Sequence, residues 1–253
     1  MERLNLRAVW INTFAVFRGN AGTLLLLALV LEGGGAVAAQ WIYGAMGPAL
    51  KATPLLGLVP WAVGFAPFVL ADAAIVVVVL VALGSGRGAL GFSLMAALGF
   101  LPTALAIDLL ENAPDIIQQF VPGLQASEFG DLISLASILL GIAWNVPWMP
   151  ALAIAAEEHL GPIATVRRSL ALMKGEWWRV LSFTLPVHLT VFLPRVMLEI
   201  VAATFNVGIP AWIVILSSTP FFALGSVTQA TLYWELARLK DGVAPRQLGA
   251  VFD

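Results

Sequence analysis

The sequence predicts an all-α, polytopic membrane protein: a single domain of six transmembrane helices, with amphipathic interfacial helices before spans one and five. Composition is the first observation. Of the 253 residues, 60% are hydrophobic and 11% are charged, and the mean hydropathy is +0.93, which a water-soluble fold of this size does not tolerate on its surface. Second, charged or proline-rich breaks divide the chain into six apolar runs, each near the 20 residues that cross the hydrocarbon layer. Third, the basic residues fall almost entirely in alternate connections.

The same composition argues against several classes of function. The formal net charge is −2, so we expect no nucleic-acid partner. With no cysteine in the chain, disulfides, thiolate nucleophiles and thiolate metal sites are excluded. His159 and His188 are too few and too far apart to suggest a zinc site, and we expect neither a metal nor a cofactor.

The first element is an amphipathic helix over residues 2–18. Leu4, Ile11 and Phe14 fall on one side and the arginines elsewhere, a pattern typical of helices that lie at the membrane surface. Span one follows at residues 21–43. Its apolar run is interrupted by Glu32 and the glycines 33–35, so we expect a retained span rather than a cleaved signal peptide.

Spans two and three are expected at residues 61–83 and 92–112. Asp72 lies near the centre of span two, and span three ends with Asp108 and Glu111. Span four, at 132–155, carries no charge, but Asn145 and the prolines 147 and 150 should bend or locally open it. Spans five and six are expected at 180–205 and 209–234.

A cytoplasmic elbow helix over residues 162–176 is expected between spans four and five. Gly161 is a stop signal, and Pro162 fits a first helical position. Apolar residues then recur at spacings of three and four and form one stripe. We expect this stripe to enter the headgroup boundary, while a rim of basic and aromatic residues meets anionic lipid or a membrane protein partner. The rim residues are Arg167, Arg168, Lys174, Trp177 and Trp178. The simpler interpretation is that the helix only joins two spans.

The distribution of basic residues predicts the orientation. Of the 13 lysines and arginines, all but Lys51 and Arg195 lie in the N-terminal segment, the loop at Arg87, the elbow and the C-terminal tail. Basic residues are retained on the cytoplasmic side during insertion. Both termini are therefore predicted to be cytoplasmic.

Three segments resemble those of a known family. Residues 157–179 read EEHLGPIATVRRSLALMKGEWWR, residues 14–20 read FAVFRGN, and residues 231–242 read TLYWELARLKDG. Together they resemble a bacterial family of six-span membrane proteins that is grouped with the membrane domain fused to some glycerophosphodiester phosphodiesterases. The resemblance implies a multi-pass protein of the bacterial inner membrane. It implies no phosphodiesterase activity, because this sequence has no such domain.

The two predicted interfacial helices also resemble each other. A shift of 156 residues places Thr13 on Ser169, Arg18 on Lys174 and Gly19 on Gly175. A duplication would relate spans one and two to spans five and six in parallel orientation. Convergence explains the match equally well, because interfacial helices draw on a limited set of residues.

Ionisable residues at membrane depth are the sharpest functional signal. Such residues are costly in lipid and usually face a bundle interior or a wet cavity. The candidate cluster contains five acids, one base and one histidine: Glu32, Asp72, Asp108, Glu111, Glu199, Arg195 and His188. One arginine cannot neutralise five carboxylates, so a proton- or cation-linked passage is one interpretation. The other is structural: Arg195 ties neighbouring spans through Glu199 and Asp72, while Asp108 and Glu111 lie at the outer interface.

From these patterns we expect a non-enzymatic bacterial inner-membrane protein. Its expected role is to support envelope or lipid organisation, or transport, within a larger membrane complex. The alternative is a small secondary transporter or channel component that uses the intramembrane carboxylates. A wet cavity that reaches Asp72 would favour the alternative, whereas spans packed tightly around a neutralised Arg195 would favour the supporting role.

Overall fold

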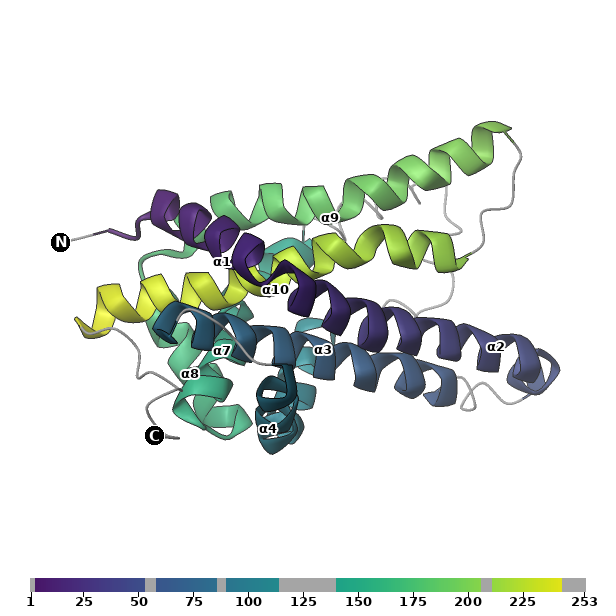
Figure 1. The fold of residues 1–253 in the computed structure, drawn as a ribbon, viewed down its shortest axis with the longest axis horizontal. Helices are drawn as coiled ribbons and strands as arrows, with labels where there is room; N and C mark the ends of the chain where they lie inside the picture. Colours follow the sequence, from purple (N-terminus) through teal and green to yellow (C-terminus); the bar gives the residue numbers. More distant parts are fainter. Residues whose placement is uncertain (1–2, 53–57, 86–89, 114–139, 206–210, 243–253) are drawn as a thin grey trace.

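The computed structural model describes residues 3–52, 58–85, 90–113, 140–205 and 211–242, and the regular elements within these ranges are all helical (Figure 1). Three of the described helices are long and apolar enough to cross a membrane: Leu6–Met46, Val59–Gly84 and Leu90–Glu111. The all-α class is thus confirmed, and the chain has the helices of a membrane protein.

The N-terminal helix is continuous where the sequence predicted a break. α1 (Leu6–Leu27), a π-helical turn η1 (Ala28–Gly33) and α2 (Gly34–Ala52) follow one another directly. Asn5 caps the start, because its side chain accepts a hydrogen bond from the Ala8 backbone N–H at 3.1 Å. The prediction of a separate interfacial helix over residues 2–18 is therefore wrong. Gly19 has open space around it, and the Asn20 side chain donates to the Val16 carbonyl at 3.0 Å, so neither residue ends the helix.

The π-helical turn η1 contains Glu32. A π turn carries one more residue than an α turn, and such turns are frequent at functional sites. η1, like α1 and α2 on either side of it, contacts both α3 and α10; the contact with α10 is more extensive for α1, and the contact with α3 is more extensive for α2.

The centre of the structure is α3 (Leu58–Ser85), which contacts α1, α2, α4, α7 and α10. Every residue from Ala71 to Val81 is buried. A helix that is apolar all round has no face suited to water and is stable only when it is covered on all sides. Asp72, at 4% exposure, is the charged exception within this buried stretch.

α4 (Leu90–Glu111) crosses the other long helices. In Figure 1, α1–α2, α3, α9 and α10 lie across the view, whereas α4 is seen nearly end-on below α3. α4 nevertheless contacts α3 and α7. This crossing brings the C-terminal end of α4 against the middle of the bundle rather than to its outer edge.

The expected break in span four is confirmed. A helical segment at 140–145 gives way to a short 3-10 helix η3 (Val146–Trp148), and α7 (Ala151–Glu158) begins after Pro150. Prolines at positions 147 and 150 cannot donate backbone hydrogen bonds, which explains the change of helix type. α7 ends at His159, whose φ of 51° is left-handed.

The elbow helix begins where the sequence predicted and ends earlier. α8 (Pro162–Met173) starts after the extended Gly161 and stops before Gly175, whose φ of +86° turns the chain into α9 (Trp177–Phe205). The equivalent Gly19 lies inside α1. The two segments of the internal echo therefore differ in local structure.

The last helix, α10 (Ala211–Asp241), returns beside α9 and α1. The hydroxyl groups of Thr13 and Thr231 lie 2.7 Å apart in the interior, and the Asn12 amide donates to Glu235 at 3.1 Å. Polar contacts of this kind hold helices together where the surroundings offer no hydrophobic driving force.

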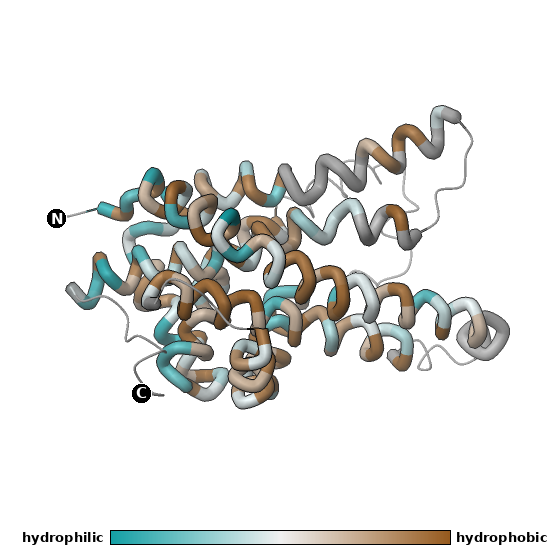
Figure 2. Tube along the Cα trace, in the orientation of Figure 1, coloured by the Kyte–Doolittle hydropathy of each residue, from teal (hydrophilic) through white to brown (hydrophobic). Residues whose placement is uncertain are grey.

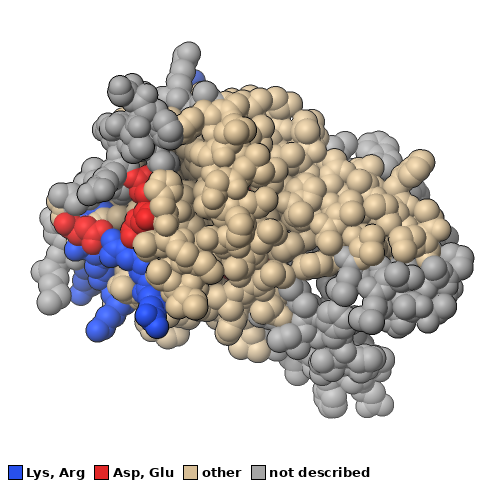
Figure 3. Space-filling view, turned by 90° about the horizontal axis from the view of Figure 1, so that it is seen from below, with Lys and Arg blue, Asp and Glu red and all other residues tan. Residues whose placement is uncertain are grey.

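Apolar side chains cover much of the exterior, as expected for a lipid-facing surface. Trp41 is 81% exposed and Met95 is 71% exposed. Figure 2 shows hydrophobic residues along the middle of the bundle and hydrophilic ones mostly where α1 begins and α10 ends. Figure 3 shows Lys and Arg side chains gathered at that same end. A single charged end is the arrangement that the basic-residue count predicts.

The contact between α2 and α3 depends on glycine. A Cβ atom on Gly35 would lie 2.9 Å from the Cβ of Pro67, whereas one on Gly34 would meet nothing within 4 Å. We therefore expect Gly35→Ala to lower the free energy of unfolding by about 1–3 kcal/mol, as overpacking does. Thermal unfolding in detergent measures the change. Gly34→Ala is the matched control and should be neutral; equal effects of the two substitutions would contradict this packing.

Candidate functional site

A half-open cavity of about 190 Å³ lies between α3, α4, α9, α10 and the η3 turn. This volume is well above the roughly 10–15 Å³ that one water molecule requires. Its lining combines acids, amides, a histidine and apolar side chains. The lining residues are Phe68, Asp72, Asp108, Glu111, Asn112, Asn145, Met149, Val187, His188, Phe222, Gly225, Ser226 and Gln229.

Three of the predicted intramembrane acids line this one cavity. Asp72 comes from the middle of α3, and Asp108 and Glu111 come from the last turns of α4. Asp72 and Asp108 are 4% and 2% exposed. Each of the three carboxyl groups has a buried oxygen without a hydrogen-bond partner. The crossing of α4 over α3 thus brings the two acids of α4 to the same cavity as Asp72.

Polar groups from three other elements complete the lining. The Ser226 hydroxyl of α10 interacts with the Asp72 carboxyl group and donates a hydrogen bond to the Phe222 carbonyl at 3.3 Å. The amide oxygens of Asn145 and Gln229 are buried and have no partner. The Asn112 side chain already makes a hydrogen bond, because its N–H donates to the Asp108 backbone carbonyl at 2.8 Å.

His188 reaches the cavity from α9. Its Nδ1 lies 3.1 Å from the Thr184 carbonyl oxygen. A carbonyl can only accept, so Nδ1 must carry the hydrogen in this contact, and Nε2 is then the nitrogen that can exchange a proton. Asp72, Asp108, Glu111 and His188 are thus brought together as the sequence predicted.

The remaining members of the predicted cluster are placed differently. Glu32 lies in η1 and does not line the cavity, but its carboxyl group interacts electrostatically with that of Asp72. One oxygen of Glu32 is also buried and unpartnered. Arg195 and Glu199 fall on α9, and their side chains lie outside the described residues. The proposed Arg195–Glu199 pair is therefore not tested.

The cavity carries no described counter-charge for its acids. None of the described residues that line it is a lysine or arginine. Across the ranges that the structure describes, no three histidine, aspartate or glutamate side chains converge closely enough to hold a metal ion. The three acids are therefore distributed around the cavity and do not form a single coordination site.

The elbow residues fall into two groups. The Arg168 Nε donates to both carboxyl oxygens of Glu158, at 3.0 and 3.2 Å, and a terminal nitrogen of Arg168 contacts Asp241 at the end of α10. Arg167, Lys174 and Trp178 are exposed instead. Arg168 thus joins α7, α8 and α10, and the exposed residues are the ones available to a membrane surface.

The elbow also touches the wall of the cavity. The Ser169 hydroxyl of α8 donates to the Pro147 carbonyl in η3. Asn145 and Met149, which flank η3, line the cavity. The position of α8 is therefore linked to the shape of the 3-10 turn.

Several site residues were not predicted from the sequence. Asn145 was expected only to bend span four, and Ser226, Phe68 and Phe222 were not assigned to a site. A serine or phenylalanine within an apolar span gives no signal of its own. The unbroken helix around Ser226 shows only after folding that this residue faces Asp72.

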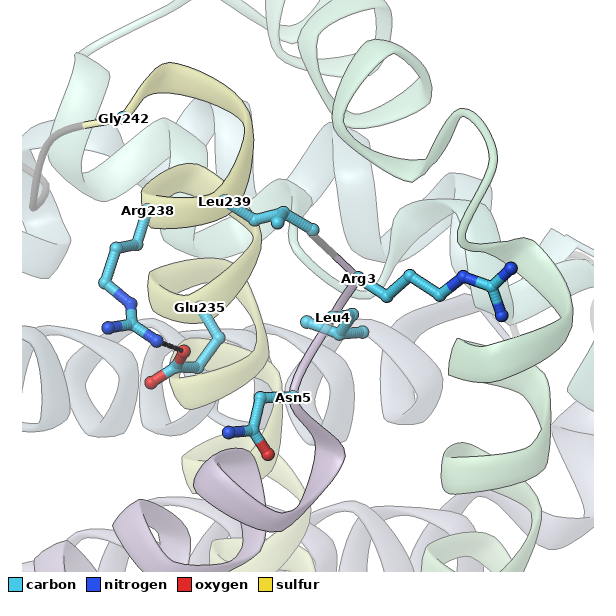
Figure 4. A pocket seen from close by; sticks show the side chains of 7 residues that line it. All are labelled: Arg3, Leu4, Asn5, Glu235, Arg238, Leu239 and Gly242. Atoms are coloured by element: carbon cyan, nitrogen blue, oxygen red, sulfur yellow. Dashed lines mark hydrogen bonds and ion pairs between the residues drawn. The ribbon is translucent and has the colours of Figure 1, made fainter. Parts of the chain in front are cut away.

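A second and larger hollow of about 450 Å³ lies where the N-terminal segment crosses the end of α10. Figure 4 shows Arg238 directed at Glu235, while the Arg3 side chain points away from both. Glu235 accepts from Arg238 at 2.8 Å and from Asn12 at 3.1 Å. Because its acid is already paired and its arginines diverge, this hollow offers no focused binding group.

Glu157 is an unusual acid at the charged end. It lies beyond the expected end of span four, and both of its carboxyl oxygens are buried and unpartnered. Burial, followed by the nearby Glu158 charge, raises the pKa of Glu157 from its ordinary value of 4.5 to about 7.

Comparisons with known proteins place the chain in no established group. No protein-family model, curated protein or solved structure matches it. The family resemblance of the elbow and the two terminal segments therefore remains a prediction.

Glu157 makes stability depend on pH. Between about pH 4.5 and 7 the folded protein holds a proton on this group that the unfolded chain has released, so the free energy of unfolding falls as pH rises through this window. We expect Glu157→Gln to flatten that slope. Thermal unfolding at a series of pH values from 4 to 8 measures it, and an unchanged slope would contradict the assignment.

Proposed function

We propose that the protein is a membrane transport component in which protons or a cation reach the acidic cavity. One observation carries the proposal: Asp72, Asp108 and Glu111 line a single cavity, and each has a buried carboxyl oxygen without a hydrogen-bond partner. This is the feature that distinguishes the passage interpretation of the sequence from the structural one.

The physical argument rests on the cost of buried charge. An isolated ionised carboxylate is strongly disfavoured away from water, so three such groups in one cavity must be protonated, hydrated or paired with a cation. Each of these states can change when a proton or cation enters or leaves. The unpartnered oxygens of Asn145 and Gln229 add neutral acceptors along the same wall.

We further propose that the chain crosses the bacterial inner membrane six times with both termini in the cytoplasm. The gathering of lysine and arginine at one end supports this orientation (Figure 3). The resemblance to a bacterial six-span family supports the localisation. α9 and α10, with 29 and 31 residues, have sufficient length to span.

A second candidate function is organisation of the membrane surface, alone or within a larger complex. The observation that favours it is the outward face of the elbow. Ile163 is 71% exposed and Trp178 is 77% exposed, and Arg167 and Lys174 are exposed beside them. An apolar stripe flanked by basic residues suits anionic lipid.

The transport proposal predicts the behaviour of Asp72 variants. Reconstituted protein is expected to carry a proton- or cation-dependent flux, and Asp72→Asn should reduce it at least about tenfold, because removing a central charge typically costs more than 1.4 kcal/mol. Flux into liposomes with an imposed pH gradient or a labelled cation measures the effect.

Thr231→Val provides the matched control for that experiment. Thr231 is buried on α10 and contacts Thr13, but it does not line the cavity. Its loss should lower stability without changing the flux. A flux that Asp72→Asn leaves intact, in folded protein, would remove the transport proposal.

The proposed surface role predicts that the exposed residues Arg167 and Lys174 affect lipid binding, whereas the paired residue Arg168 affects stability. Replacing Arg167 and Lys174 by alanine should weaken binding to vesicles that contain phosphatidylglycerol by about 1 kcal/mol per charge. Arg168→Ala should instead lower the free energy of unfolding by roughly 1–2 kcal/mol, because it breaks partly buried ion pairs. Vesicle sedimentation and thermal unfolding separate the two effects. If replacing Arg167 and Lys174 leaves lipid binding unchanged, the surface role fails.

A further inference from the structure

This inference rests on the proposed function and concerns the ligand that enters the acidic cavity. We infer that the cavity binds a small organic ammonium ion: a primary ammonium that carries a short apolar group. The observations behind this are the unpartnered acceptor oxygens and the pair of aromatic rings that line the same cavity.

The acceptor oxygens define the polar end of the ligand. Among the described lining residues, five buried side-chain oxygens lack a hydrogen-bond partner: one each from Asp72, Asp108, Glu111, Asn145 and Gln229. An unmade hydrogen bond in a buried place is costly. A ligand that satisfies these groups must donate rather than accept, and positive charge suits the three acids. An ammonium group offers up to three N–H donors and one positive charge.

The aromatic and apolar side chains of the lining define the apolar part of the ligand. Phe68 of α3 and Phe222 of α10 both line the cavity, with ring centroids 4.7 Å apart and an interplanar angle of 46°. An aromatic face attracts a cation within about 6 Å of its centre. Met149 and Val187 extend this apolar part of the lining, where a short hydrocarbon group is more stable than in water.

The same features disfavour other ligands. A bare divalent ion needs several oxygens at coordination distance, and no three acidic or histidine side chains of the described ranges converge in that way. A neutral polar solute would leave the three acids uncompensated. An anion would be repelled by them. The volume of about 190 Å³ holds a small molecule and not a long chain.

The experiment measures binding of n-butylammonium to the purified full chain in phosphatidylglycerol nanodiscs by isothermal titration calorimetry. Neutral n-butanol and sodium ion are the two comparison ligands. We expect saturable binding of n-butylammonium, at least tenfold weaker binding of both comparison ligands, and at least tenfold loss in Asp72→Asn. Phe222→Leu keeps an apolar side chain but removes the ring, and should weaken ammonium binding about fivefold. Thr231→Val should bind as the unchanged chain does.

A second arm distinguishes a free amine from an amine-bearing lipid headgroup. If the ammonium comes from lipid, nanodiscs of phosphatidylethanolamine should compete with n-butylammonium and weaken its apparent binding; if the ligand is a free amine, the two kinds of nanodisc should give the same affinity. Both results support an ammonium site.

Two outcomes overturn the inference, and they separate it from the function that it deepens. If sodium ion binds or is transported in an Asp72-dependent manner while n-butylammonium does not bind, the ligand class is wrong and the proposed function stands. If n-butylammonium and n-butanol bind equally, or if Asp72→Asn leaves folded protein with full ammonium binding, the acidic cavity does not recognise the cation.

Discussion

Burying Asp72 in a helix that is apolar on every side is the constraint on which the rest of the structure depends. The neighbouring helices cover the stretch from Ala71 to Val81 of α3 completely and also accommodate one carboxyl group within it. Ser226 interacts with this carboxyl group, one oxygen of which has no hydrogen-bond partner and belongs to the cavity lining. The surroundings do not neutralise this group with a described base. They place two further acids beside it, which is an expensive arrangement for a part that serves only to hold helices together.

The cavity exists because two elements depart from simple spans. α4 crosses α3 and delivers Asp108 and Glu111 to the interior. Span four gives up its α-helical form at η3, which presents Asn145 and Met149 to the same space. α8 reaches this turn through the hydrogen bond from Ser169 to Pro147, and Arg168 ties α8 to α7 and α10. The charged end and the cavity are thus parts of one connected framework.

Features that depend on local composition were predictable from the sequence, whereas features that depend on how the helices cross were not. Hydropathy located the long helices, proline positions predicted the break near Asn145, and Gly161–Pro162 predicted the start of α8. The prediction of a separate interfacial helix at 2–18 was wrong, because the sequence alone does not show whether a helix continues through Gly19 and Asn20. Asp72, Asp108, Glu111 and His188, which were grouped from their cost in lipid, line one cavity. Their common cavity was not predictable, since it depends on the crossing of α4, which no local pattern encodes.

The π-helical turn at Ala28–Gly33 has a consequence for how the N-terminal helix fits its neighbours. An extra residue in one turn rotates everything beyond it by roughly 100° about the helix axis relative to an uninterrupted α-helix. α1 and α2 can therefore present different sides of one continuous helix, with α1 packed more extensively on α10 and α2 more extensively on α3. A long straight helix would have to compromise between the two partners. The inserted residue removes that compromise and sets the carboxyl group of Glu32 at the point where the phase changes.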